Sequence, residues 1–137
     1  MIIRLKGQGG HCFPRSSRSF FPSLFRQRKT FTMTTVIVQS GACGYTVTIK
    51  AERRKSGKIA ISLQTDCEMV LKMAGDLAVL DRLSALAGFP RNPVYASAAR
   101  HLKHVACPVP AAILKALEVE AGLNVAKDAS ISFVKET

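Results

Sequence analysis

Two stretches near the middle of the chain alternate apolar and polar residues, and this pattern most constrains the fold. The apolar members are Tyr45, Val47, Ile49 and Ala51 in the first stretch and Ile59, Ile61 and Leu63 in the second. A period of two places the side chains of one kind on one face of a strand. Because the polar link of residues 53–57 is short and contains a glycine, we predict an antiparallel hairpin with one apolar face.

The register of this hairpin leads to a prediction about two cysteines. A turn centred on Lys55 pairs Ile49 with Ile61 and places nearly all apolar residues opposite one another. The same register, extended to the open end of the hairpin, places Cys43 opposite Cys67. Directly opposite residues have Cβ atoms about 4.5–5.5 Å apart. We therefore expect the two thiols to be neighbours.

The remaining pattern predicts strands at both ends of a domain and helices between them. Residues 34–39 are rich in β-branched residues, and Ile131 and Phe133 alternate with polar residues within residues 128–134. Helical spacing with capping residues predicts four helices, which begin at Asp66, Asp81, Asn92 and Pro110. We predict an α+β domain in which three N-terminal strands and a C-terminal strand form a small antiparallel sheet packed by three to four helices.

The first 32 residues differ in composition from the rest of the chain. They contain seven of the 20 basic residues, five of the seven phenylalanines and no acidic residue. We predict a disordered basic extension over residues 1–32 and a single domain over residues 33–137. Three origins of the extension stay open: read-through upstream of a true start at Met33, a mitochondrial or plastid transit peptide, and a genuine basic arm. The net charge of +11 depends largely on this segment, so we do not expect a nucleic-acid partner.

Several classes of protein are excluded by composition. No apolar run approaches the ~18 residues that a membrane span needs, and four cysteines in 137 residues are too few for a disulfide-built mini-protein. The chain has no phosphate-binding glycine loop and no Ser–His–Asp pattern. We expect a cytoplasmic protein without a membrane partner, or an organellar one if residues 1–32 are a transit peptide. A protein partner and a homodimer both remain open.

Three cysteines stand where one predicted element ends and the next begins. Two of them, Cys67 and Cys107, are expected at helix N-termini, which lower the pKa of a thiol and favour a thiolate. Thiolates bind zinc and iron–sulfur clusters, and a tetrahedral zinc needs four ligands. The candidate metal ligands are Cys43, Cys67, Cys107 and His104, with Asp66 and His101 as further candidates. We therefore expect zinc or an iron–sulfur cluster as the cofactor.

Three segments carry a resemblance to a known family. Residues 40–46, 65–67 and 103–123, with the patterns Gly-x-Cys-Gly, Asp-Cys and Ala-Cys-Pro-Val-Pro, resemble a small family of uncharacterised prokaryotic proteins, a domain of unknown function. The resemblance covers residues 34–136. It implies a small cytoplasmic domain with three cysteines and no established activity.

Two more distant similarities concern the placement of the cysteines. The TSCPD domain is similar in having Gly-x-Cys, a cysteine that opens a helix after a hairpin, and Cys-Pro before a later helix, although Val105-Ala106 replaces its Thr-Ser. The iron–sulfur assembly scaffold family is similar in having three cysteines on an α+β domain. The chain departs from that scaffold: Tyr45 stands where an Asp follows the first cysteine, no His directly precedes Cys107, and the Leu-Pro-Pro-Val-Lys motif is absent.

Four functional hypotheses follow from these observations. The leading one is a non-enzymatic domain that binds a metal or an iron–sulfur cluster through its cysteines. The second is a thiol-redox enzyme with Cys67 or Cys107 as an activated nucleophile. The third is a structural or interaction module in which the cysteines only pack. The fourth is nucleic-acid binding through the basic extension.

Overall fold

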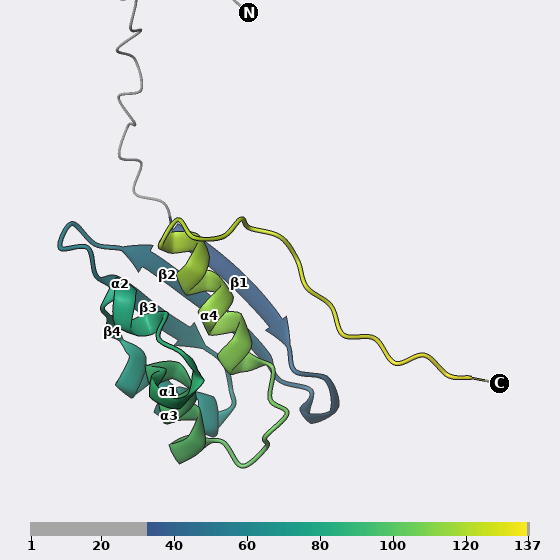
Figure 1. Cartoon of the computed structure of the whole chain (residues 1–137). Helices are drawn as coiled ribbons and strands as arrows, with labels where there is room; N and C mark the ends of the chain where they lie inside the picture. Colours follow the sequence, from purple (N-terminus) through teal and green to yellow (C-terminus); the bar gives the residue numbers. More distant parts are fainter. Residues whose placement is uncertain (1–32, 137) are drawn as a thin grey trace, which may run out of the picture.

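In the part of the chain that the structure describes, the helices cover one face of a single antiparallel sheet and leave the other face open (Figure 1). The structure is a computed structural model that describes residues 33–136, so the predictions for residues 1–32 lie outside it. The strands, in the order in which they lie in the sheet, are β1 (Met33–Gln39), β2 (Thr46–Arg53), β3 (Ile59–Gln64) and β4 (Val79–Leu80). The predicted α+β class is confirmed.

Four α-helices and two short 3-10 turns complete the described residues. The helices are α1 (Glu68–Leu77), α2 (Arg82–Ala85), α3 (Pro93–His101) and α4 (Val109–Glu120). The 3-10 turns are η1 (Gly41–Cys43), which joins β1 to β2, and η2 (Phe89–Arg91), which precedes α3. None of the helices within residues 33–136 is long and apolar enough to span a bilayer.

The apolar face of the central strand forms the middle of the core. Val47, Ile49 and Ala51 of β2 are fully buried, and the polar residues between them lie on the open face. Helix α4 crosses β1 and β2 on the covered side, where Ile113 and Leu117 are also fully buried. The period-two pattern therefore predicted the correct buried face of β2.

The predicted register of the hairpin was wrong by two residues. Ile49 pairs with Leu63 instead of Ile61, because the turn is centred one residue later than expected. The Gly57 N–H donates to the carbonyl of Arg54 at 3.0 Å, and Gly57 has a φ of 81°, a conformation that favours glycine. A shift of two residues keeps the same side chains on the same face.

The shifted register also removes the cross-strand pairing predicted for two cysteines. Strand β2 begins only at Thr46, and the register that pairs Ile49 with Leu63 does not place Cys43 opposite Cys67. Any proximity between the two thiols has to come from the loops beyond the strand ends.

The predicted C-terminal strand is also wrong. Residues 128–134 have no strand assignment, and the fourth strand is instead Val79–Leu80, which pairs with Ile59 and Ala60 of β3. Ile131 and Phe133 are 88 % and 98 % exposed. An alternating pattern predicts an extended backbone but does not supply a partner strand, and this segment finds none within residues 33–136.

Two of the predicted helix caps are confirmed and one is not. The Leu83 N–H donates to Asp81 Oδ1 at 2.9 Å, and the Val94 N–H donates to Asn92 Oδ1 at 2.9 Å. Asp66 does not cap α1, because the residue at the N-cap position is Cys67. Helix α4 begins one residue before the expected Pro110.

Asn92 holds the turn before α3 together as well as capping the helix. Its side chain is 3 % exposed and donates to the carbonyls of Ala85 and Ala87 at 2.8 and 2.9 Å. We predict that Asn92→Ala lowers the free energy of unfolding by at least about 2 kcal/mol, because it removes a cap and leaves buried carbonyls without a donor. Urea unfolding of the full chain measures this.

Asn92→Asp separates the two roles of this side chain, because it keeps a cap acceptor but loses both donors. We expect it to be destabilised as well. Asn124→Ala, at an exposed position, is the control. An Asn92→Ala variant within about 0.5 kcal/mol of the wild type would show that these hydrogen bonds contribute little.

A carboxylate on α1 connects that helix to α3. Asp76 Oδ2 accepts from Ser97 Oγ at 2.7 Å and from Arg100 Nη2 at 2.8 Å, and His101 Nε2 lies 2.8 Å from the same oxygen. The Arg100 hydrogen bond, followed by those of Ser97 and His101, holds the pKa of Asp76 well below its usual range.

We predict that Asp76→Asn lowers the melting temperature of the full chain at neutral pH. The depressed pKa of Asp76 contributes stability that is present above the unfolded-state pKa of about 3.9 and is lost as the pH falls below it. The difference between wild type and variant should therefore narrow below about pH 4. Asp128→Asn, on the exposed C-terminal segment, is the matched control. Equal melting temperatures at pH 7 would contradict the prediction.

Candidate functional site

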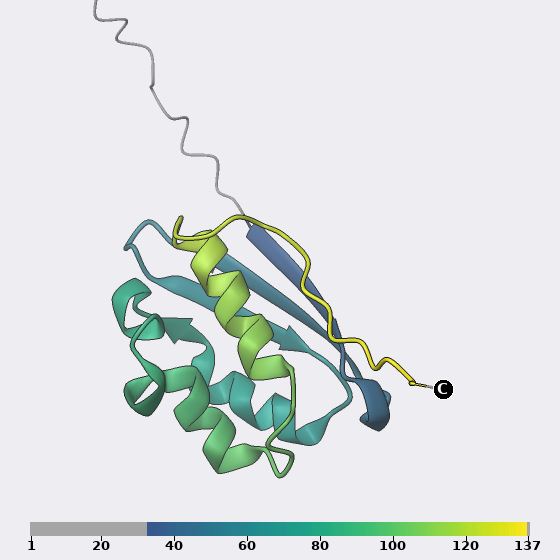
Figure 2. The same ribbon diagram turned by 45° about the vertical axis from the view of Figure 1, so that its right-hand side comes forward.

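A small cavity of about 40 Å³ lies at one end of the sheet, where three junctions of the chain meet. Figures 1 and 2 show η1, the start of α1 and the α3–α4 loop at this same end. The cavity is lined by three cysteines and a histidine, which are Cys43, Cys67, Cys107 and His104, and by Ser40, Tyr45, Met69, Val70 and Leu102. The structure thus brings the three cysteines and His104 of the sequence prediction around one cavity.

Cys67 lies at the N-terminal end of α1 and is buried. It occupies the N-cap position, and its backbone N–H donates to Thr65 Oγ1 at 3.2 Å. Its carbonyl accepts the Leu71 N–H at 3.0 Å and so begins the helix. The helix N-terminus favours negative charge at this position.

Cys107 lies two residues before the start of α4 and is half-buried. Its N–H donates to the carbonyl of His104 at 3.2 Å, which forms a turn that brings His104 to the cavity. Burial raises the pKa of the Cys107 thiol, and a hydrogen bond from the Val109 N–H acts in the opposite direction. The nearby charges of Cys43 and Cys67 raise this pKa further.

Cys43 is the exposed member of the group and lies on η1. Its Sγ donates to the carbonyl of Ser40 at 3.7 Å. Gly41 and Gly44 flank it with φ values of 71° and 73°, and the Gly44 N–H closes the turn on the Gly41 carbonyl at 2.9 Å. These left-handed conformations explain the Gly-x-Cys-Gly sequence, since only glycine adopts them without strain.

The two further candidates of the sequence prediction do not line the cavity. Asp66 is exposed, although it directly precedes Cys67. His101 faces α1, where its Nε2 lies 2.8 Å from Asp76 Oδ2. The sequence reasoning missed the five other lining residues, which are Ser40, Tyr45, Met69, Val70 and Leu102. Each is within three residues of a cysteine or of His104, which is the one signal in the sequence that points to them.

The side chains that line the cavity are not in a ligating arrangement. Within residues 33–136, no group of three or more His, Cys, Asp or Glu side chains is placed to hold a metal ion. Part of the reason is local: the Cys43 thiol is directed to the carbonyl of Ser40 in its own turn. Joint ligation would require the thiols to deprotonate and to rotate toward one another.

Comparison with known proteins places the chain in a family. Residues 34–133 match a family of unknown function (DUF6951), and the chain belongs to that family. The predicted resemblance to a domain of unknown function is therefore confirmed, while the similarities to the TSCPD domain and to the iron–sulfur scaffold receive no support. No curated protein and no solved structure shows significant similarity to the chain.

The raised pKa of Cys107 predicts a specific loss of stability at alkaline pH in the metal-free protein. The folded state holds the Cys107 proton more tightly than the unfolded state does, so this stability is present below the unfolded-state pKa and is lost as the pH rises through the folded-state value. Cys107→Ser should remove that part of the pH dependence.

Urea unfolding in reductant and chelator gives the change in the free energy of unfolding between about pH 7 and about pH 10. Other groups also titrate in this range, so the contribution of Cys107 is the difference between wild type and variant. Cys12→Ser, outside residues 34–133 of the family match, is the control. If Cys107→Ser loses as much stability as the wild type between the two pH values, the burial of this thiol does not contribute as stated.

Proposed function

We propose that this member of a family of unknown function binds a single thiophilic cation, with zinc as the reference ion, between the thiolates of Cys43, Cys67 and Cys107. The observation that carries the proposal is that these residues come from three separate junctions yet line one cavity. A single buried cysteine often behaves as a small hydrophobe. That explanation does not account for three thiols around one space, one of them on an exposed turn.

The donor set and the size of the cavity favour a mononuclear ion. Thiolates prefer zinc and other soft or borderline cations to magnesium or calcium. A volume of about 40 Å³ exceeds the roughly 10–15 Å³ that one water needs but is small for a cluster of several iron and sulfur atoms. His104 lines the cavity and could provide a fourth, nitrogen ligand for tetrahedral zinc.

The electrostatic environment of the Cys107 thiol also supports a cationic ligand. The charges of Cys43 and Cys67 oppose ionisation of this thiol, and a cation placed among the three would replace that repulsion with attraction. The Val109 N–H already donates to the Cys107 sulfur, as outer hydrogen bonds to metal-bound thiolates commonly do. Metal binding would release protons, so zinc affinity should rise with pH.

Cys43, on the β1–β2 turn, is one of the thiols that must move for ligation. Cys43 is exposed, and a Cβ built at Gly41 or Gly44 would meet no other atom within 4 Å, so the turn lies in open space. The Cys43 thiol would leave the Ser40 carbonyl and turn toward the buried Cys67. Ion binding in this account therefore brings the Cys43 turn toward Cys67 and Cys107, which lie at and just before the N-termini of α1 and α4.

One of these observations argues against Cys107 as the nucleophile of a thiol enzyme. A nucleophilic cysteine needs a depressed pKa so that the thiolate is present at neutral pH. Burial has the opposite effect on Cys107, because it raises the pKa of that thiol. Cys107 therefore lacks the property that a catalytic nucleophile needs.

We predict that the full chain, purified without oxygen and reconstituted with zinc, retains about one zinc per chain after gel filtration. The cysteine variants Cys43→Ser, Cys67→Ser and Cys107→Ser should each lose most of the bound zinc, because two thiolates hold the ion much less tightly than three. Elemental analysis by mass spectrometry gives the ratio of metal to protein. Cys12→Ser, matched in chemistry, should bind as the wild type does.

The outcomes separate the proposal from its rivals. Full zinc occupancy in all three variants would show that the ion is bound elsewhere and would overturn the proposal. Absence of zinc from the reconstituted wild type would overturn it too, and a disulfide formed under mild oxidant would then favour thiol-redox chemistry. Iron and acid-labile sulfide in the purified protein would instead indicate a cluster.

A further inference from the structure

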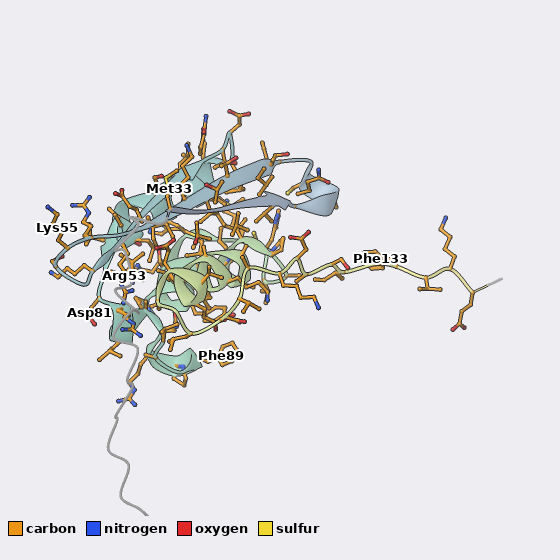
Figure 3. The ribbon with its side chains drawn as sticks, turned by 90° about the horizontal axis from the view of Figure 1, so that it is seen from above. Met33, Arg53, Lys55, Asp81, Phe89 and Phe133 are labelled. Atoms are coloured by element: carbon orange, nitrogen blue, oxygen red, sulfur yellow. The ribbon has the colours of Figure 1, made fainter. Side chains whose placement is uncertain are left out.

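The C-terminal segment projects from the body and has no partner strand in the part of the chain that the structure describes. Residues 125–136 form no helix or strand, and Ile131, Phe133 and Val134 are 88 %, 98 % and 87 % exposed. Figure 3 shows Phe133 on this segment, well away from the sheet and the helices. We call residues 128–134 the arm. The family match extends to residue 133, so most of the arm lies within the matched residues.

The first strand of the sheet offers an edge that nothing within the described residues covers. In residues 33–136, β1 pairs only with β2, and its other side has no neighbouring strand. Its sequence, Met-Thr-Thr-Val-Ile-Val-Gln, contains no charge and no proline, and Ile37 is 67 % exposed. Natural proteins protect long edge strands with lysine, proline, bulges or a covering segment. This strand lacks the protective residues, so a covering segment is expected.

The arm begins beside this edge but does not pair with it in its own chain. Thr34 of β1 and residues 124–128 line a common groove, which places the start of the arm next to the start of β1. Figures 1 and 2 both show the segment running from there in the same general direction as β1. Within residues 33–136, a segment without a partner and a sheet edge without a neighbouring strand therefore lie near each other.

We propose that the arm of one copy pairs with β1 of a second copy, and reciprocally, so that each sheet gains a strand in a two-fold symmetric dimer. In this dimer each arm pairs with the β1 edge of the other copy, so both edges are covered and the assembly is closed. Within one chain the arm runs in the same general direction as β1 (Figures 1 and 2). A two-fold axis perpendicular to the strands reverses the direction of the partner's arm, which therefore runs antiparallel to β1, the more stable pairing. Ile131 and Phe133 share one side of the arm and could pack across from Ile37.

The test uses the full chain and two kinds of arm variant. Light scattering after gel filtration should give a dimer for the wild type and a monomer for the double variant Ile131→Glu/Phe133→Glu. A second double variant, Ile131→Pro/Ser132→Pro, should also be monomeric, because consecutive N–H groups point to opposite sides of a strand and one of them must face β1. Leu83→Glu, at a 77 % exposed position on α2, adds charge elsewhere and should stay dimeric.

Amide hydrogen exchange identifies the surface that the arm contacts. Residues 33–39 should exchange slowly in the wild type and faster in both arm variants, while circular dichroism shows that the domain remains folded. A monomeric wild type would overturn the proposal, as would a dimer that persists in both arm variants. A dimer lost without any change in exchange at residues 33–39 would also overturn it and would point to the open groove beside Phe89 and Leu123.

Discussion

The packing of α4 across β1 and β2 is the interaction on which the rest of this structure depends. Ile113 and Leu117 are fully buried in the core that includes the apolar face of β2, and at the other end of the helix Thr34 donates to the buried Glu120 at 2.6 Å. The helix is thereby fixed at both ends relative to the sheet. Because Cys107 lies two residues before α4 begins, the same packing fixes the position of that thiol.

The convergence of the three cysteines is a consequence of topology. In an antiparallel meander, the end of the first strand, the start of the second and the end of the third lie at the same end of the sheet. Cys43 therefore comes to the same end as Cys67, which follows β3, and α4 brings the segment before it to that end as well. The cavity forms where loops from these three junctions meet, and helix N-termini face it from α1 and α4.

The sequence predicted the buried faces of strands and the helix caps better than it predicted which strands pair and in which register. Alternation identified the buried side of β2, and Asn92 capped α3 as its side-chain chemistry suggests. The register failed because the position of Gly57 in the turn, and not the match of apolar residues, set it; a two-residue shift leaves that match nearly unchanged. The cysteines still came together, although by loop placement instead of cross-strand pairing. The strand predicted around Phe133 failed because alternation cannot say whether the partner lies in the same chain.

The most direct test of the central claim is the coordination of zinc in the reconstituted full chain. X-ray absorption at the zinc edge should show three sulfur neighbours at about 2.3 Å and one nitrogen or oxygen at about 2.0–2.1 Å, as expected for a site built from Cys43, Cys67 and Cys107. Loss of one sulfur neighbour in Cys43→Ser would tie the exposed turn to the site. A shell of nitrogen and oxygen alone would contradict the account, because it would mean that the three thiols meet without binding the ion.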